Sequence, residues 1–167
     1  ALPEAAIGCD VLCGFPGETA TEAENTRRLL AELPISYLHV FPYSRRPGTL
    51  AGVYGQQLSG PVKDERVRQL RALDVELRQR LYARNLGRTL RVLVERRQRK
   101  GGLLQGFSEN YLPLVFAGGQ ELVHRVVPVR VDRIEAGQPI GVVDEALLEE
   151  TGESRYSGQP SAEGADT

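Results

Sequence analysis

The hydrophobic pattern at the start of the chain predicts a strand, a helix and a second strand. Residues 5–13 (AAIGCDVLC) form a short apolar run that is typical of a buried strand. The sequence GFPGE then predicts a turn, and Thr21–Glu24 fits a capping box, so we expect a helix that begins near Glu22 and ends at Pro34. Residues 35–41 (ISYLHVF) predict the second strand. A strand–helix–strand unit of this kind predicts a parallel sheet with a right-handed crossover.

A loop and a long helix follow. Residues 42–60 show no periodic pattern and predict irregular chain. From Pro61 to about Asn85 apolar residues recur every three to five positions, which predicts one long helix with a single apolar stripe of Val62, Val67, Leu70, Leu73, Leu77 and Leu81. Two parallel strands do not form a domain alone, because parallel sheets are covered on both faces and contain more strands. Residues 1–84 therefore predict the end of a larger α/β sheet or barrel.

Beyond Gly87 the pattern changes to alternating apolar and polar residues separated by glycine-containing turns. This alternation predicts four or five short antiparallel strands, which would form a small β-barrel over residues 85–143. From Asp144 the chain loses its apolar content, so we expect residues 144–167 to be an acidic, disordered tail. The expected fold class is therefore α/β plus β.

Charge is distributed unevenly, although the 167 residues carry a net charge of only −1. Between Pro61 and Lys100 there are 13 Lys and Arg against 5 Asp and Glu, whereas from Asp144 onward there are 7 acidic residues and one Arg. A basic middle segment indicates a polyanionic partner, with a solvated helix face as the alternative. No apolar run reaches the ~20 residues that cross a bilayer, so we expect a cytoplasmic protein without membrane contact. Methionine is absent, and we interpret the chain as a fragment that lacks its N-terminal part, with a processed chain as the alternative.

The only two cysteines are Cys9 and Cys13, in the first expected strand. Strand residues four apart share a face but lie ~13 Å apart at ~3.3 Å per residue, too far to hold one cluster. We interpret both as structural. His39 and His124 have no Cys, Asp or Glu cluster at metal-ligand spacing, so the sequence predicts no metal site in this chain.

Three stretches carry a family resemblance: DVLCGFPGET (10–19), SYLHVFPYSRRPGT (36–49) and GFSENYLPL (106–114). Together they resemble the radical S-adenosylmethionine methylthiotransferases, and most of all the tRNA threonylcarbamoyladenosine methylthiotransferase branch. The resemblance covers residues 5 to about 131. It implies that residues 1–84 are the C-terminal strands and helices of a radical, partial TIM-like barrel, and that residues 85–143 are an OB-like TRAM domain that binds RNA. The acidic tail departs from the family pattern.

The resemblance also implies a reaction. In the family, a radical derived from S-adenosylmethionine activates carbon 2 of N6-threonylcarbamoyladenosine beside the anticodon, and a methylthio group is inserted there. The family uses two 4Fe-4S clusters, whose cysteines we expect in a missing upstream segment, so this chain alone should be inactive and hold no catalytic residue. We expect a monomer whose partner is the tRNA anticodon stem-loop. Two alternatives stay open, namely a non-catalytic RNA-binding TRAM protein and a methylthiotransferase of the isopentenyladenosine tRNA or ribosomal-protein branch.

Candidate binding residues form two groups. The resemblance implies that the turn after the first strand lies beside the adenosyl part of S-adenosylmethionine, and ligands of α/β folds do bind at the carboxyl ends of strands. This group comprises Gly14, Phe15, Pro16, Gly17, Glu18, Tyr43 and Ser44. Basic residues beside aromatic residues fit RNA phosphates and stacked bases, and arginine forks also suit the threonylcarbamoyl carboxylate. This second group comprises Arg45, Arg46, Arg88, Arg96, Arg97, Arg99, Lys100, Phe107, Asn110 and Tyr111. The alternatives are an ordinary strand–helix turn, a surface loop and a charged hairpin tip.

Overall fold

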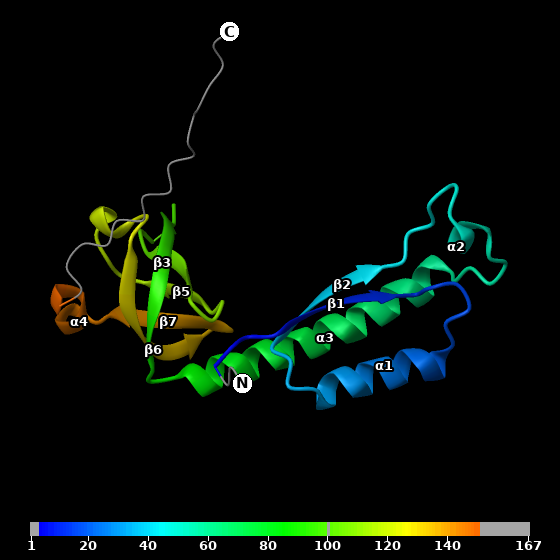
Figure 1. Cartoon of the computed structure of the whole chain (residues 1–167), viewed down its shortest axis with the longest axis horizontal. Coiled ribbons are helices and arrows are strands. Elements are labelled where there is room, and N and C mark those ends of the chain that lie inside the picture. The colour runs from blue at the N-terminus through cyan, green and yellow to red at the C-terminus, as the bar shows by residue number, and fades with distance from the viewer. Residues whose placement is uncertain (1–3, 100, 151–167) are drawn as a thin grey trace, which may run out of the picture. The chain divides into compact units, whose positions relative to one another are not determined.

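The structure is a computed structural model that describes residues 4–99 and 101–150. The chain divides into two compact units, Ala1–Arg84 and Asn85–Thr167, which we describe separately (Figure 1).

The first unit is a strand–helix–strand arrangement followed by a long helix. Its elements are β1 (Gly8–Cys13), α1 (Ala20–Glu32), β2 (Tyr37–Pro42), α2 (Leu50–Val53) and α3 (Gly60–Asn85). Strands β1 and β2 are parallel, as the alternation of strand and helix predicts. Helices α1 and α3 lie along the same face of this two-stranded sheet (Figure 1). Buried side chains from β1, β2, α1 and α3 form one core, made of Val11, Cys13, Leu30, Leu38, Val67, Leu70, Leu73 and Leu77.

Details of this unit differ from the sequence-based expectation. Helix α1 begins at Ala20 rather than near Glu22, and its capping box joins Thr19 to Glu22 instead of spanning Thr21–Glu24. A short helix, α2, lies within the stretch expected to be irregular. The stripe of α3 is buried as expected except at Val62, which is 41% exposed.

The second unit is a closed five-stranded barrel. Its elements are β3 (Thr89–Arg97), β4 (Leu104–Ser108), β5 (Pro113–Phe116), the 3-10 helix η1 (Gln120–Leu122), β6 (Val126–Glu135), β7 (Gln138–Val143) and α4 (Glu145–Glu150). The strands close in the order β3-β4-β5-β7-β6. Inward residues alternate with outward ones, and on β3 the inward Leu90, Val92 and Val94 are at most 4% exposed.

Two expectations for this unit need correction. The barrel is not antiparallel throughout, because β5 and β7 pair in parallel at Val115 and Ile140. A closed ring with an odd number of strands cannot alternate direction at every pair, so at least one pair must run parallel. The segment expected to be a disordered tail begins with a helix, α4, and the remainder of that tail, residues 151–167, lies outside the described residues. Among the described residues, no helix combines the length and apolar character that a membrane span requires.

Candidate cofactor loop and nucleic-acid interface

The GFPGE turn after β1 is a tight loop whose conformation requires glycine. Gly14 and Gly17 have φ angles of +78° and +85°, in the left-handed region that glycine adopts without strain. Within the turn, the Gly14 N–H donates to Glu18 Oε2 at 2.7 Å and the Glu18 N–H donates to the Phe15 carbonyl at 3.0 Å. The Gly17 N–H donates to the carbonyl of Gln56 at 2.9 Å, which ties the turn to the loop after α2. The backbone of the turn is therefore fixed before any ligand binds.

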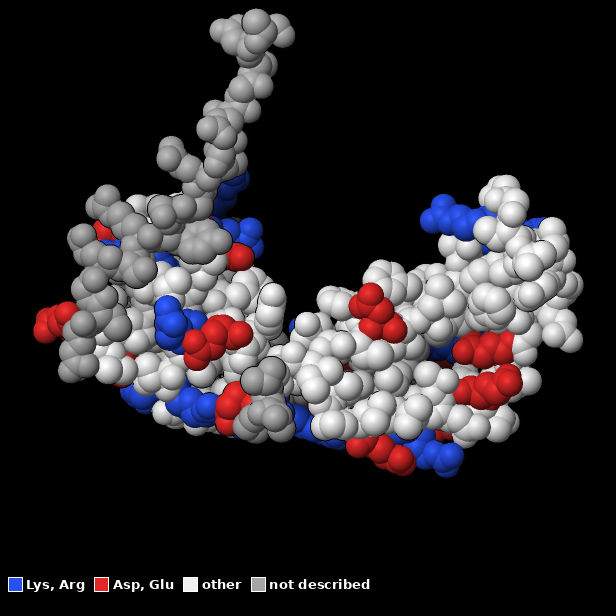
Figure 2. Space-filling model, viewed as in Figure 1, with Lys and Arg blue, Asp and Glu red and all other residues white. Residues whose placement is uncertain are grey.

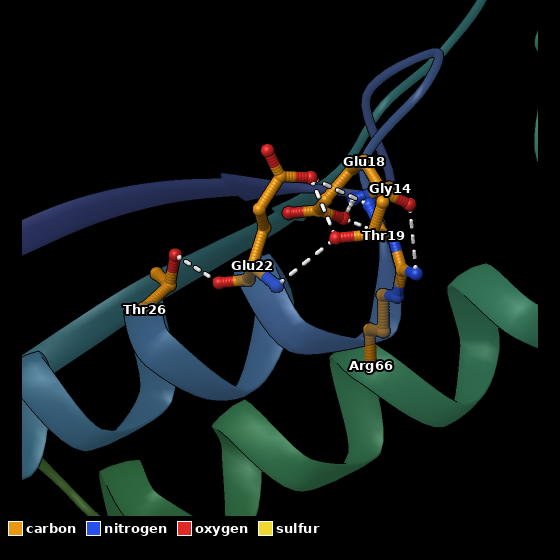
Figure 3. A network of polar contacts seen from close by, with 6 residues as sticks. All are labelled: Gly14, Glu18, Thr19, Glu22, Thr26 and Arg66. Atoms are coloured by element: carbon orange, nitrogen blue, oxygen red, sulfur yellow. Dashed lines mark hydrogen bonds and ion pairs between the residues drawn. The ribbon is translucent and has the colours of Figure 1, made fainter.

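Glu18 is the centre of a polar network with Arg66 of α3 (Figure 3). The Arg66 guanidinium forms an ion pair with the Glu18 carboxylate, and Arg66 Nη2 also donates to the Glu18 carbonyl at 3.0 Å. The two side chains are only 10% and 16% exposed, respectively. Sequence reasoning did not identify Arg66, and the only signal for it was its position beside Val67 on the apolar stripe. Because its carboxylate is occupied by these contacts, Glu18 holds the turn against α3.

The same network continues into the start of α1 (Figure 3). The Thr19 N–H donates to Glu22 Oε2 at 2.8 Å, and the Glu22 N–H donates to Thr19 Oγ1 at 3.2 Å. Hydrogen bonds from the Thr19 backbone N–H and then from its hydroxyl lower the pKa of Glu22. The turn and the helix start therefore form one continuous, hydrogen-bonded segment.

Tyr43 offers an unused polar group next to this turn. Its N–H donates to the Cys13 carbonyl at 2.8 Å, and its ring packs edge-on against Phe15, with the ring centroids 5.3 Å apart. The Tyr43 hydroxyl is buried and has no hydrogen-bond partner among the described residues. Phe15 is 41% exposed and also contacts Tyr54, a residue that sequence reasoning did not identify. A buried hydroxyl without a partner beside an exposed ring fits a ligand with a polar group and a flat face.

The remaining residues of the loop after β2 have different roles. Arg45 Nε donates to the Gly52 carbonyl at 2.7 Å, so this guanidinium supports the end of α2. Ser44 and Arg46 are exposed. Of the two adjacent arginines, Arg46 is therefore the one whose charge is fully available to a ligand.

Both cysteines are free and lie in β1. Cys13 is buried and Cys9 is half-buried. Burial, followed by the nearby charge of Glu18, raises the pKa of the Cys13 thiol. Within residues 4–99 and 101–150, no group of three His, Cys, Asp or Glu side chains is arranged to hold a metal ion. The described residues thus do not fit an iron–sulfur cluster.

The basic residues expected to contact RNA do not form a single cluster. Arg96 and Arg97 end β3, and Arg99 follows in the hairpin, with all three side chains exposed. Arg88 precedes β3 and so lies at the opposite end of this nine-residue strand. Lys100 lies outside the described residues. Figure 2 shows acidic and basic side chains interspersed on the visible face of each unit, so neither unit presents a field of one sign there.

The turn after β4 separates exposed aromatic residues from a buried amide. Phe107 and Tyr111 are 37% and 67% exposed, whereas Asn110 is 7% exposed. The Asn110 amide donates to Asn85 Oδ1 at 3.2 Å, and its carbonyl oxygen accepts from the Ser108 hydroxyl at 2.6 Å. Asn110 therefore holds the turn in place, and we leave it out of the RNA-contacting surface that we expected it to join.

A closed five-stranded barrel of this size is typical of small OB-like domains. Comparison with protein families identifies it, because residues 83–141 match the TRAM domain. Residues 83–141, which make up most of the described part of the second unit, are therefore a TRAM domain.

Comparison with curated proteins gives matches that cover the first unit as well as the TRAM domain. The chain is 34% identical over 158 residues to the threonylcarbamoyladenosine tRNA methylthiotransferase MtaB of Bacillus subtilis, covering 89% of this chain and 35% of that protein. It is 40% identical over 120 residues to the MtaB of Aquifex aeolicus, covering 72% of this chain and 28% of that protein. It is also 36% identical over 135 residues to the tRNA-2-methylthio-N(6)-dimethylallyladenosine synthase of Protochlamydia amoebophila, covering 78% and 29% of the two chains.

These matches confirm the family resemblance. The chain is homologous to the tRNA methylthiotransferases and spans about a third of the length of the curated relatives it matches. Two different branches occur among the relatives, so the comparisons establish the family and not the branch.

Proposed function

We propose that the chain is part of a radical S-adenosylmethionine tRNA methylthiotransferase that modifies carbon 2 of N6-threonylcarbamoyladenosine beside the anticodon. The observation that carries this proposal is one alignment that runs through both units, 158 residues long, to a protein named for that activity. Residues 1–84 would be the last part of the radical barrel, and residues 85–143 would bind the tRNA anticodon stem-loop. The full-length enzyme would act as a cytoplasmic monomer.

In this proposal the first unit forms one wall of the cofactor pocket. S-adenosylmethionine supplies the radical chemistry when it is bound. The exposed ring of Phe15 offers a flat face for the adenine, and the buried Tyr43 hydroxyl offers a hydrogen bond to its polar edge. Glu18 and Arg66 would not contact the cofactor but would keep the turn in position. The iron–sulfur ligands would come from other parts of the enzyme, so this chain alone should be inactive.

The exposed Arg46 would bind the carboxylate of the threonylcarbamoyl group. A planar guanidinium pairs with a carboxylate through two parallel hydrogen bonds. Its neighbour Arg45 is engaged with the Gly52 carbonyl, which makes it the matched control. In the full-length enzyme, Arg46→Gln should raise the KM for tRNA carrying threonylcarbamoyladenosine while leaving thermal stability unchanged, whereas Arg45→Gln should lower stability.

The hairpin after β3 would bind tRNA phosphates. Replacing Arg96, Arg97, Arg99 and Lys100 with glutamine should weaken tRNA binding and lower the slope of log K against log salt by about 0.7–0.9 for each phosphate that the protein no longer neutralises. The control is Arg130→Gln with Arg133→Gln, two exposed arginines of β6 on the same barrel. An unchanged slope in the hairpin variant would exclude the hairpin as the phosphate-binding site.

The enzymatic assignment is tested on tRNA itself. The full-length gene is expressed in a bacterial strain without methylthiotransferases, and tRNA nucleosides are analysed by mass spectrometry. Gain of the methylthio form of threonylcarbamoyladenosine supports the proposal. Gain of the methylthio form of the isopentenyl nucleoside assigns the other tRNA branch. If tRNA binds but neither nucleoside changes, a non-catalytic RNA-binding protein is the better description.

A further inference from the structure

The outer face of the TRAM barrel carries an open hollow that the phosphate-binding hairpin does not explain. Its volume is about 590 Å³, within the range of about 300–1,000 Å³ that is usual for small-ligand sites. Its lining comes from β3, β4, the turn after β4 and the start of β6, and comprises Arg91, Leu93, Glu95, Phe107, Ser108, Glu109, Tyr111 and Val126. We call this set the β3–β4 hollow.

The floor of the β3–β4 hollow is apolar and is set by strand register. Leu93 lies opposite Phe107 on one side and opposite Val126 on the other, so the three side chains form a row across β4, β3 and β6. Leu93 and Phe107 are each 37% exposed, although they lie in the middle of paired strands. Such a flat apolar row with an aromatic member provides a stacking platform.

The rim of the hollow is held rigidly by buried hydrogen bonds. Ser108 Oγ accepts from the Leu112 N–H at 2.9 Å and donates to the buried Asn110 at 2.6 Å. The Glu109 N–H donates to the Arg91 carbonyl at 3.0 Å, which fixes the turn to β3. Tyr111 has a φ angle of +60°, an uncommon conformation for a residue with a bulky side chain. Backbone strain of this kind persists where the surrounding structure over-determines it, often at ligand sites, and here it leaves the Tyr111 ring 67% exposed.

Three charged side chains surround this floor, and none of them is used by the fold. Arg91, Glu95 and Glu109 make no side-chain hydrogen bond or ion pair to any described residue. One positive and two negative charges do not favour a phosphate group. They do complement a ligand that is flat, neutral and carries both hydrogen-bond donors and acceptors on its edges, which is the chemistry of a nucleobase.

Among the four RNA bases, guanine matches this set best. It presents two adjacent donors, N1–H and the N2 amino group, which one carboxylate can accept together. It also presents O6 and N7, which an arginine can contact with two hydrogen bonds. Uracil has one N–H donor, and adenine and cytosine have one amino group without an adjacent N–H. We propose that the β3–β4 hollow binds a single unpaired guanine of the RNA, stacked on Phe107 or Tyr111 and read by Glu95 or Glu109 together with Arg91. This inference rests on the proposed function, because it requires that the barrel bind RNA.

The test uses the whole 167-residue chain and four fluorescein-labelled nine-nucleotide RNAs. Each RNA is oligouridine with U, A, C or G at the central position, and binding is measured by fluorescence anisotropy. We expect the guanine RNA to bind about tenfold more tightly than oligouridine, since a well-matched base contact changes affinity by about this factor or more. Phe107→Leu and Tyr111→Asn should weaken binding of the guanine RNA by about fivefold or more, as expected for loss of base stacking, without changing the salt slope. Asparagine is chosen at position 111 because it tolerates the left-handed conformation.

Replacing the two glutamates of the hollow should change the affinity for the guanine RNA and for oligouridine in opposite directions. Glu95→Gln with Glu109→Gln should abolish the guanine preference, because an amide has one acceptor and a donor that opposes the guanine N–H groups. The same variant should bind oligouridine more tightly, because two negative charges near the RNA are removed. Glu121→Gln, an exposed glutamate outside the hollow, should change neither property. Both rim glutamates are exposed, so this variant tests the site even if an aromatic variant fails to fold.

Failure of this inference is separable from failure of the proposed function. Equal binding of all four RNAs by a chain that still binds tRNA through the hairpin arginines would overturn the guanine site alone. Equal affinity of the wild type, Phe107→Leu and Tyr111→Asn for the guanine RNA would do the same. Absence of binding to both tRNA and oligonucleotides would overturn the RNA-binding role and the guanine site together.

Discussion

The ion pair between Glu18 and Arg66 should contribute more to stability than the other ion pairs of the first unit. Replacing Arg66 with methionine leaves the Glu18 carboxylate, only 16% exposed, with the Gly14 N–H as its remaining backbone donor. Removing one partner of a buried pair costs about 3–5 kcal/mol. Because water still reaches part of this pair, we expect a loss of about 2–3 kcal/mol in the free energy of unfolding. Glu18→Gln keeps one acceptor for Gly14 and should cost about 1–2 kcal/mol.

A double-mutant cycle isolates the pairing itself. The variant with both Glu18→Gln and Arg66→Met removes both charges, so its loss should be smaller than the sum of the single losses by about 1–2 kcal/mol. Urea unfolding followed by circular dichroism at 222 nm reports mainly on this unit, because it contains α1 and α3, of 13 and 26 residues.

The matched control for this cycle is the ion pair of Glu65 with Arg68 on α3. Its side chains are 48% and 71% exposed, so its coupling should be about 0–0.5 kcal/mol. If the Glu18–Arg66 coupling were as small as that of the control, the pair would behave as a solvent-screened contact. The view that Glu18 fixes the GFPGE turn against α3 would then be wrong.

Three further predictions address other parts of the chain. In the native protein at pH 8, iodoacetamide should modify Cys9 well before Cys13, since burial raises the pKa of Cys13; equal rates by peptide mass spectrometry would contradict this. Thr19→Ala should cost about 1 kcal/mol. Hydrogen bonds lower the pKa of Glu22, so the stability they contribute is present above its ordinary value of 4.5 and is lost as the pH falls through the lower folded value. Thr19→Ala removes only the share that comes from the hydroxyl, so the difference between the thermal melts of wild type and variant should narrow in acid but persist, because the Glu22 N–H still donates to Thr19 Oγ1 in the wild type. Gly106→Ala should unfold the barrel, because its Cβ would overlap a backbone carbonyl of β3, and resistance of residues 85–143 to limited proteolysis equal to that of the wild type would refute this.

The elements of both units could be predicted from hydrophobic periodicity, but the start of α1 could not. The Ser/Thr-x-x-Glu pattern occurs twice in this stretch, at Thr19–Glu22 and at Thr21–Glu24, and the two are equivalent as sequence patterns. The structure uses the first because the turn ends at Glu18, whose contacts to Gly14 and Arg66 place Thr19 at the helix start. A tertiary contact to a helix about 48 residues away thus selects between two equal local signals.

In the candidate sites, local sequence patterns likewise fail to predict the positions of Asn110 and Arg66. The residue types of the turn after β4 correctly indicate exposed aromatic groups, but they do not reveal that Asn110 is directed inward to Asn85, 25 residues earlier in the chain. Arg66 is a charged residue in a helix, a pattern typical of a solvated face, yet it is 9% exposed. Both cases are polar groups buried by long-range pairing, and no local pattern encodes the partner.

The two proposed RNA contacts of the barrel differ in what they select. Strand β3 ends in Arg96 and Arg97, whereas its outward face before them carries Arg91, Leu93 and Glu95. The arginines at the end of β3 attract any phosphate, and salt weakens this binding. The β3–β4 hollow repels phosphate and binds only a base. The basic residues expected to contact RNA do not form a single cluster, so affinity should depend on short-range contacts. An RNA that offers only backbone, such as a continuous duplex, would engage the hairpin alone, and one with an unpaired base nearby would engage both. On this argument the barrel should discriminate a loop from a stem at moderate salt, where the hairpin contact by itself no longer suffices.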